Sequence, residues 1–520
     1  MAWRIVYLLN LLALTATGQP SQTRFNYASS PSEEWDFNAK PSINNTGHLI
    51  FDTVSALLQH WPNSRYRNGH NIVPGLVPVG TLLYHGRGDS NLPAEPQWTS
   101  TDPEHAYRFC RGGSDVGCWQ LTLVTTRPLN VLYFDGASAV KIRDGPMDSQ
   151  DIVAWGRIVP EWTGSERKRL QDLCMWGQQF SLDGFVRCRL SSEIMLCDFT
   201  EGVQVASFLN LVSHGRGPGG PPRRPPGRNP FPPSNVSSMG WDTVVQSSSW
   251  HNRYPGDTRI HLDLSRLISF YDTSLVPSLI PHRFNQERWD YRIAGISDKD
   301  IKAVLSSLES ELRKPQGGSS GIDWMTLIHV IVDRYAERLD MVRYLLNSTE
   351  HDTPTTTKLV YAQVEIMLQP YILHSLSPSA GQDDYSWAAP IFRLCTTTHT
   401  SYIEVPLLSA RLTYSERLIF QALSETNREI CRVVTRMWVQ GISAGLEKYS
   451  SPVSPFGSLL ESWKHDINVL MDWLDWNVWV MCRPACAFEE HCYLPTWPFF
   501  GPRKDWERPQ PRCIRKVEPL

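Results

Sequence analysis

A segment rich in proline, glycine and arginine divides the chain and limits what it can fold into. Residues 214–235 read HGRGPGGPPRRPPGRNPFPPSN, in which Phe231 is the only large apolar residue. Such a composition cannot bury enough apolar surface to form a core, so we expect a solvated, semi-extended linker over residues 214–240. The linker separates two halves with different sequence patterns.

The half before the linker has the pattern of a mixed α+β domain. Short runs rich in β-branched and aromatic residues, such as GTLLYHG, WQLTLVTTRPLNVLYFDG and EIMLCDF, alternate with turn residues. Helical periodicity is clearest in SERKRLQDLCMWGQQF, residues 165–180, where Ser165 is placed to cap. We assign residues 78–213 to this domain and residues 19–77 to an N-terminal extension.

The half after the linker is predicted to be mainly helical. Residues 241–295 form a connecting arm, in which RIHLDLSRLISFYD is either one more strand or a segment that returns to the first domain. Apolar residues three and four positions apart then predict a helical bundle over residues 296–481. The helical runs cover residues 297–314, 322–347, 356–376, 413–446 and 456–481. Residues 482–520 form a cysteine-rich tail.

The N-terminus and the cysteines both predict a secreted, extracellular protein. Residues 1–18 have a basic residue, a short apolar run and small residues near a cleavage point, which is the layout of a signal peptide. The chain has 11 cysteines, in three clusters, and export favours disulfides over a zinc site in the tail. The odd number leaves at least one thiol unpaired. Export would also make Asn44, Asn235 and Asn347 acceptors for N-glycans.

Charge and hydropathy limit the partners. With 50 basic and 53 acidic residues the chain is nearly neutral, whereas a nucleic-acid-binding surface is basic. After the signal, no run reaches the roughly 18 apolar residues that a membrane helix needs. We therefore expect no nucleic acid and no membrane span in the mature chain.

Three short segments carry the residue types that chemistry requires. His85 ends an apolar strand and precedes Gly86, where the backbone can approach a ligand closely. Thr99 and Ser100 follow in WTSTDPEHAYRF, and Glu193 begins the β-rich run IMLCDF. The chain has no phosphate-binding glycine loop, no GxSxG elbow and no HExxH motif, so the common nucleotide, lipase and zinc-protease readings have no support.

The order of these segments resembles that of the ADP-ribosyltransferase-like superfamily. LYHG, WTSTDPEHAYRF, RPLNVLYFDG and SSEIMLCDF follow one another as the corresponding elements do in that family, over residues 78–205. The resemblance implies a split sheet with NAD as the substrate in its cleft, and no metal is expected.

The resemblance also implies roles for particular residues. His85, with Gly86, would hold the ribose of NAD, Thr99 and Ser100 would support the cleft, and Tyr107 would stack on nicotinamide. Glu193 would be the catalytic glutamate, and His85 would be the second catalytic residue. Cleavage of the nicotinamide–ribose bond passes through an oxocarbenium-like state, which a fixed carboxylate stabilises.

Several functions are consistent with this pattern. Arginine-modifying members of the family carry Glu or Gln two residues before the catalytic glutamate, where this chain has Ser191. NAD hydrolysis, transfer of ADP-ribose to an unknown acceptor, and a non-catalytic binding or structural role at a fungal cell surface all stay open. The segments RPLNVLYFDG, MDSQDIVAWG and CYLPTWPFF also resemble uncharacterised secreted fungal proteins, which brings no activity with it.

Overall fold

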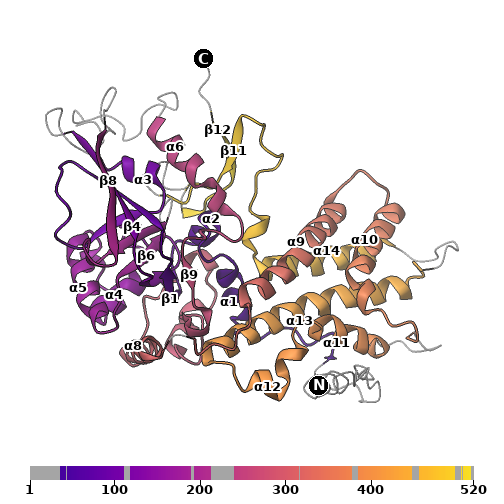
Figure 1. Ribbon diagram of the computed structural model, residues 1–520. Helices are drawn as coiled ribbons and strands as arrows, with labels where there is room; N and C mark the ends of the chain where they lie inside the picture. Colours follow the sequence, from indigo (N-terminus) through magenta and orange to yellow (C-terminus); the bar gives the residue numbers. More distant parts are fainter. Residues whose placement is uncertain are drawn as a thin grey trace, which may run out of the picture.

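Figure 1 shows the fold in a computed structural model of the chain. The structure describes residues 35–42, 44–110, 117–188, 192–211, 239–315, 317–376, 385–447, 456–497, 505 and 507–516. The predicted signal peptide, Ser191, most of the predicted linker and the predicted glycan acceptor Asn235 lie outside the described residues.

A large curled sheet organises the first half of the fold, so the predicted mixed α+β class is confirmed. Its strands lie in the order β10-β1-β5-β6-β7-β3-β2-β4-β8, with β9 also paired to β1. Among the strands that the structure describes, β5 and β6 pair in parallel and the other pairs are antiparallel. The strands are β1 (Asn71–Val77), β2 (Leu82–Arg87), β3 (Gln97–Ser100), β4 (Cys118–Thr125), β5 (Leu129–Phe134), β6 (Gly184–Cys188), β7 (Ser192–Leu196), β8 (Val203–Leu211), β9 (His261–Leu262) and β10 (Ile268–Ser269).

The segment after the linker returns to this sheet. Both β9 and β10 pair with β1 in an antiparallel manner. The arm therefore forms two short strands and also returns to the first half of the fold. The sheet thus takes strands from outside residues 78–213, because β1 precedes that range and β9 and β10 follow it.

Helices cover one face of the sheet and enclose a core there. Phe185 and Met195 of the sheet pack in this core with Leu173 of α5 and Ile301 of α8. Helix α8 follows the linker, and its sequence led us to expect it in the bundle. Its apolar face instead packs in the core of the sheet. The helices in this half are α2 (Trp61–Ser64), α3 (Pro103–Tyr107), α4 (Asp148–Trp155), α5 (Glu166–Gln178), α6 (Met239–Ser248), α7 (Ile280–Arg283) and α8 (Asp298–Arg313).

The remaining helices form the bundle on the right of Figure 1. They are α1 (Gly47–Ser55), α9 (Trp324–Asn347), α10 (Thr353–Leu368), α11 (Ala389–Thr397), α12 (Pro406–Ser409), α13 (Tyr414–Ser443) and α14 (Phe456–Leu474). Helix α13 begins with a capping box formed by Thr413 and Glu416, which satisfies backbone N–H groups of its first turn. The apolar faces of these helices share a core with the other face of the sheet, including Val73 and Leu121.

Disulfides form within all three cysteine clusters. The pairs are Cys110–Cys118, Cys174–Cys197, Cys395–Cys431, Cys482–Cys492 and Cys486–Cys513. The predicted odd thiol is Cys188, which is buried in β6. The two tail pairs fasten the hairpin of β11 (Glu490–Tyr493) and β12 (Arg512–Arg515).

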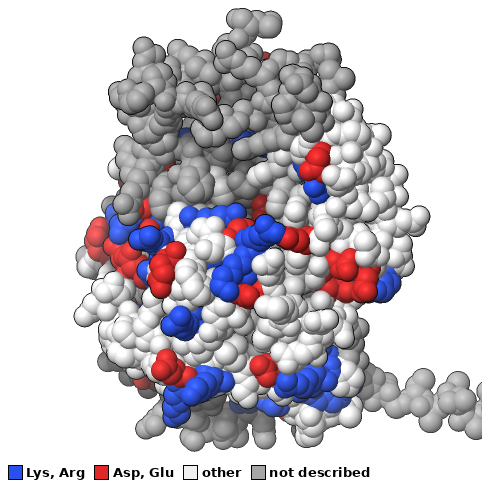
Figure 2. Space-filling model, turned by 90° about the vertical axis from the view of Figure 1, so that its left-hand side faces the viewer, with Lys and Arg blue, Asp and Glu red and all other residues white. Residues whose placement is uncertain are grey.

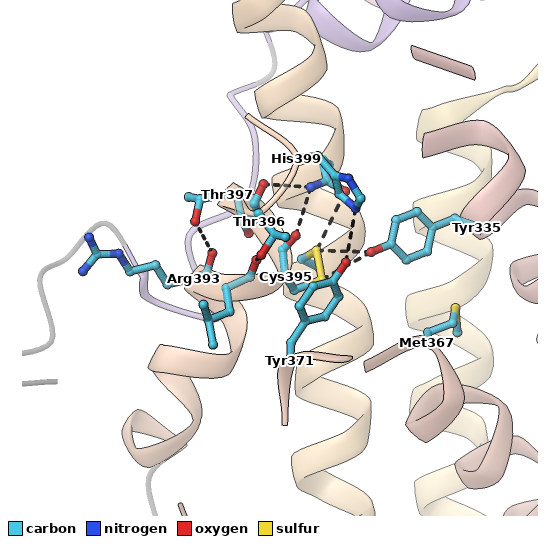
Figure 3. The surroundings of a disulfide bond; sticks show 12 residues. Tyr335, Met367, Tyr371, Arg393, Cys395, Thr396, Thr397 and His399 are labelled. Atoms are coloured by element: carbon cyan, nitrogen blue, oxygen red, sulfur yellow. Dashed lines mark hydrogen bonds between the residues drawn. A yellow bond between two sulfur atoms is a disulfide. The ribbon is translucent and has the colours of Figure 1, made fainter. Parts of the chain in front are cut away.

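One disulfide lies inside the bundle and fastens α11 to α13. Figure 3 shows Cys395 beside the hydroxyl of Tyr335, which lies 3.4 Å from its sulfur. The side chain of Asn427 donates to the backbone carbonyl of Cys395 at 3.1 Å, and Tyr371 and His399 lie 3.2 Å apart nearby. The disulfide is therefore surrounded by hydrogen-bonded polar groups of α9, α13 and the segment after α10.

The surface carries both signs of charge. Figure 2 shows Lys and Arg side chains interspersed with Asp and Glu over the face at the left of Figure 1, where α4 and α5 lie. Among the described residues, no helix combines the length and the hydropathy that a bilayer crossing requires.

Candidate functional site

The strand register brings Ser100, Glu193 and Arg187 into one row across the sheet. Ser100 of β3 is opposite Glu193 of β7, and Glu193 is opposite Arg187 of β6. Residues that are directly opposite in antiparallel strands project from the same face. Two of the residues that the sequence singles out, Ser100 and Glu193, are therefore neighbours, and an arginine completes the row.

A histidine and an arginine hold the Glu193 carboxylate. Its Oε1 lies 3.2 Å from Nε2 of His105 in α3, and Arg187 donates to its Oε2 at 3.3 Å. The side chain of Glu193 is only 5% exposed and that of Arg187 only 2%. A buried carboxylate needs such partners, because an isolated one would be strongly destabilised.

Arg187 also binds a second carboxylate, that of Glu166 at the start of α5. It donates to Glu166 Oε1 at 2.5 Å, and Lys141 Nζ lies 3.7 Å from the other oxygen. Burial raises the pKa of Glu166, but the positive charge and hydrogen bond of Arg187 outweigh it and leave this pKa below its usual value. Burial likewise lowers the pKa of Arg187, and the two glutamates outweigh it and raise this pKa.

This charged cluster opens on a small cavity. The cavity has a volume of about 140 Å³, and Glu193, Glu166 and Arg187 all line it. Its other walls are Trp98, Phe109, Ala139, Lys141 and Trp497. Trp497 belongs to the C-terminal tail and is buried, so the tail closes one side of the cavity.

His85 lies behind this wall. Its ring contacts Trp98 edge to face, with centroids 4.9 Å apart, and Phe199 at 5.7 Å. Its strand neighbour Leu121 belongs to the core on the opposite face of the sheet from Glu193. Burial, and next the charge of Arg87, lower the pKa of His85 to about 4, so its ring is neutral near pH 7. The structure therefore links His85 to the cavity through Trp98.

Three of the other predicted residues, Gly86, Thr99 and Ser100, contact the protein's own backbone. A side chain at Gly86 would meet the carbonyl oxygen of Ala106 at 2.0 Å, so α3 occupies the space above it. Thr99 donates to the carbonyl of Ile194 at 2.8 Å, and Ser100 accepts from the Asp102 N–H at 3.1 Å. Tyr107 is half-buried at the end of α3 and is not among the described residues that line the cavity.

Four residues of the site were not predicted from the sequence: His105, Arg187, Glu166 and Lys141. A signal exists for Arg187, since a charged residue interrupts the otherwise apolar run GFVRC, and such a residue in a buried strand needs a carboxylate partner. The other three come from a helix or a loop whose position over the sheet only the tertiary fold fixes.

Comparison with known proteins gives relatives but no activity. Residues 118–223 match the family model described as the YPL277C N-terminal domain, a range that contains Glu166, Arg187 and Glu193. The uncharacterized protein YOR389W of Saccharomyces cerevisiae is 23% identical over 555 residues, covering 90% of this chain and 84% of its own length. A second one, YPL277C of the same yeast, is 24% identical over 64% of this chain and 83% of its own length. Both of these relatives of the chain are uncharacterised fungal proteins.

No solved structure matches the chain. The family model and the two yeast relatives confirm the predicted resemblance to uncharacterised fungal proteins. The family match covers β4 through β8, whereas β2, β3 and α3, which supply His85, Ser100 and His105, precede it.

Proposed function

We propose that this protein cleaves the nicotinamide–ribose bond of NAD, with Glu193 as the catalytic carboxylate. The observation that supports this most is a buried carboxylate at the wall of a cavity, with one oxygen held by His105 and the other by Arg187. A carboxylate fixed in this way is preorganised to stabilise positive charge that develops on a ribosyl group.

In the proposed reaction the bond between ribose C1′ and the nicotinamide nitrogen breaks. Nicotinamide leaves with the bonding electron pair, and water or an acceptor adds at C1′ and loses a proton. Glu193 would stabilise the oxocarbenium-like state by accepting a hydrogen bond from a ribose hydroxyl. His105 and Arg187 act as positioning residues for this carboxylate, and His85 positions Trp98.

The cavity size sets a condition on this proposal. A volume of about 140 Å³ is below the roughly 300–1,000 Å³ of typical small-molecule sites. The cavity therefore accepts one ring-sized part of the dinucleotide, and the rest must lie outside it or displace Trp497. We expect Trp497→Ala to enlarge the cavity and to lower the KM for NAD.

The decisive experiment measures nicotinamide release from NAD by the purified full chain. We expect Glu193→Gln to reduce the rate by about 100-fold or more, the usual effect of removing a preorganised group. Glu201→Gln, which changes an exposed carboxylate, is the matched control and should leave the rate unchanged. Mass spectrometry of the products separates hydrolysis from transfer of ADP-ribose to an acceptor. No release by the unmodified chain, or equal release by the Glu193 variant, refutes the proposal.

One observation favours the alternative, a non-catalytic binding or structural protein of a fungal cell surface. Both oxygens of Glu193 are engaged by protein donors, so the carboxylate is already satisfied without a ligand. In this alternative the cluster only fastens α3 and α5 to the sheet. Calorimetry with NAD distinguishes the two, since a structural cluster binds no NAD.

We also propose that the protein is exported, with a signal peptide at residues 1–18 and N-glycans. Five disulfides support this, because such bonds form and persist in oxidising compartments. The acceptors Asn44 and Asn347 are both exposed. Expression in yeast tests the proposal: the chain should enter the medium and lose mass on glycosidase treatment, whereas an unmodified intracellular chain contradicts it.

A further inference from the structure

A second cavity lies where the N-terminal segment, the arm and the bundle meet. It has a volume of about 420 Å³, within the size range of small-molecule sites. Helices α1, α7, α13 and α14, which are far apart in the sequence, all contribute to its walls. It shares no lining residue with the cavity beside Glu193.

Arg283 is the unusual residue of this cavity. It is only 9% exposed, and its Nη2 donates to the backbone carbonyl of Phe270 at 2.6 Å. Its Nε and Nη1 are buried and have no hydrogen-bond partner among the described residues. The guanidinium lies over the ring of Tyr271 at 5.0 Å. A buried cation with unused donors is costly unless an anion completes it.

The charges of the other Lys, Arg, Asp and Glu side chains on the walls cancel. Arg432 is bound to Glu429 through two hydrogen bonds of 2.7 and 2.6 Å, so this pair is neutral. Lys40 and Asp466 add one charge of each sign. Arg283 therefore leaves the walls with a net charge of one positive unit.

The rest of the wall is apolar and aromatic. The rings of Trp473 and His48 are in tilted contact, with centroids 4.4 Å apart. Leu49, Ile280 and Leu470 also line the cavity. Burial, and next the charge of Arg288, lower the pKa of His48 to about 3, so this histidine adds no charge near pH 7. These side chains offer a surface for an apolar body beside the cationic group.

We propose that this cavity binds a small organic monocarboxylate, with its carboxylate on Arg283 and its apolar body against Trp473 and Leu470. The guanidinium fork matches the two oxygens of a carboxylate. A single net positive charge fits one carboxylate better than a doubly charged phosphate. The proposal does not depend on the function of the cavity beside Glu193.

The test compares acids with their own amides on the purified full chain. Phenylacetate, indole-3-acetate and hexanoate are titrated by calorimetry, each beside its neutral amide, together with phenyl phosphate. We expect at least one acid to bind with a Kd below about 1 mM and its amide to bind about tenfold or more weakly. No binding by any acid, equal binding by the amide, or tighter binding of phenyl phosphate overturns the proposal.

Variants locate the binding. Arg283→Leu should weaken the acid by about tenfold or more. Asp466→Asn removes an acidic wall group whose Oδ2 is buried without a hydrogen-bond partner in the described part of the chain, and it should tighten the acid severalfold. Asp472→Asn, an exposed change on the same helix α14, is the matched control and should have no effect. If Arg283→Leu does not fold, the two aspartate variants decide, and equal affinities in these two contradict the proposal.

Discussion

Arg187 is the residue on which the buried charges of the sheet depend. Its guanidinium lies between the carboxylates of Glu166 and Glu193, whose side chains are 20% and 5% exposed, so Arg187→Met would leave both carboxylates without this cation. We expect this variant to lower the free energy of unfolding by about 3–5 kcal/mol at pH 7. Urea unfolding measures the loss, and Arg167→Met, on a side chain that is 72% exposed, should cost less than about 0.5 kcal/mol.

The pH dependence of this loss follows from the same charges. Glu166 has a lowered pKa in the folded chain, so its ion pair stabilises the fold above its ordinary pKa and is lost as the pH falls. In Arg187→Met, protonation of the two carboxyl groups removes their uncompensated negative charge and so stabilises the folded variant. The difference between variant and unmodified chain should therefore shrink from pH 7 to pH 4, and a constant difference would contradict the ion-pair account.

His85 contributes a separate acid sensitivity. Its pKa is about 4 in the folded chain and near 6.5 when unfolded, so between these values only the unfolded chain takes up the proton. Stability is therefore lost as the pH falls below 6.5. His85→Phe should reduce the slope of unfolding free energy against pH in this window by up to about 1.4 kcal/mol per unit. His261→Gln, an exposed change, should leave the slope unaltered.

At the scale of elements, the approach of α3 to β2 sets the geometry of the site. A Cβ at Gly86 would lie 2.0 Å from the Ala106 carbonyl and 2.8 Å from the Cys110 nitrogen, both of them backbone atoms. Gly86→Ala must therefore push α3 away, and we expect a loss of about 1–3 kcal/mol in the free energy of unfolding. Gly164→Ala, where nothing lies within 4 Å of the added carbon, is the matched control and should be near neutral.

The same displacement should reach the candidate site. His105 is on α3 and contacts Glu193, so moving α3 lengthens that contact. If Gly86→Ala leaves both the stability and the amide exchange of α3 unchanged, the close approach does not control the position of His105.

At the scale of the whole molecule, the two halves share their cores. Val73 and Leu121 of the sheet belong to one continuous core with Leu339 and Trp463 of the bundle. The second core joins Phe185 of the sheet to Ile301 of α8. Cutting the chain at the linker would therefore expose apolar surface on both pieces.

We expect the full chain to unfold in one cooperative transition, because a continuous core links its halves. Fragments 35–213 and 239–520, expressed alone, should lack the sharp unfolding transition of the full chain and should recover it when expressed together. Calorimetry of the full chain and of each fragment measures this. Two independent transitions in the full chain, or a fragment that folds alone, would contradict the shared core.

Local patterns predict many of the elements. Each of the five helical runs in the second half contains a helix, although α10 ends at Leu368 and α14 at Leu474. The cap predicted at Ser165 is wrong, because its side chain makes no capping hydrogen bond to α5. The alternation of apolar residues likewise locates β2, β4 and β5. Spacing along the chain did not reveal that α8 packs on the sheet, because an amphipathic face specifies burial and not the partner that buries it.

The candidate site shows the same division. Glu193 and Ser100 are identifiable from their residue types, and the register places them side by side. His105 and Arg187 can be recognised as site residues only from their contacts with Glu193 in the folded chain. His85 contacts Trp98, which lies between His85 and the cavity beside Glu193.

The mixed class, the longest helices, the candidate carboxylate and the odd number of cysteines can all be read from the sequence, because periodicity, residue type and parity are local or countable properties. The pairing of the cysteines, the contacts of His105 and Arg187 with Glu193, and the core shared by the two halves emerge only in the folded chain. These depend on strand order and helix docking, which many distant weak contacts fix together.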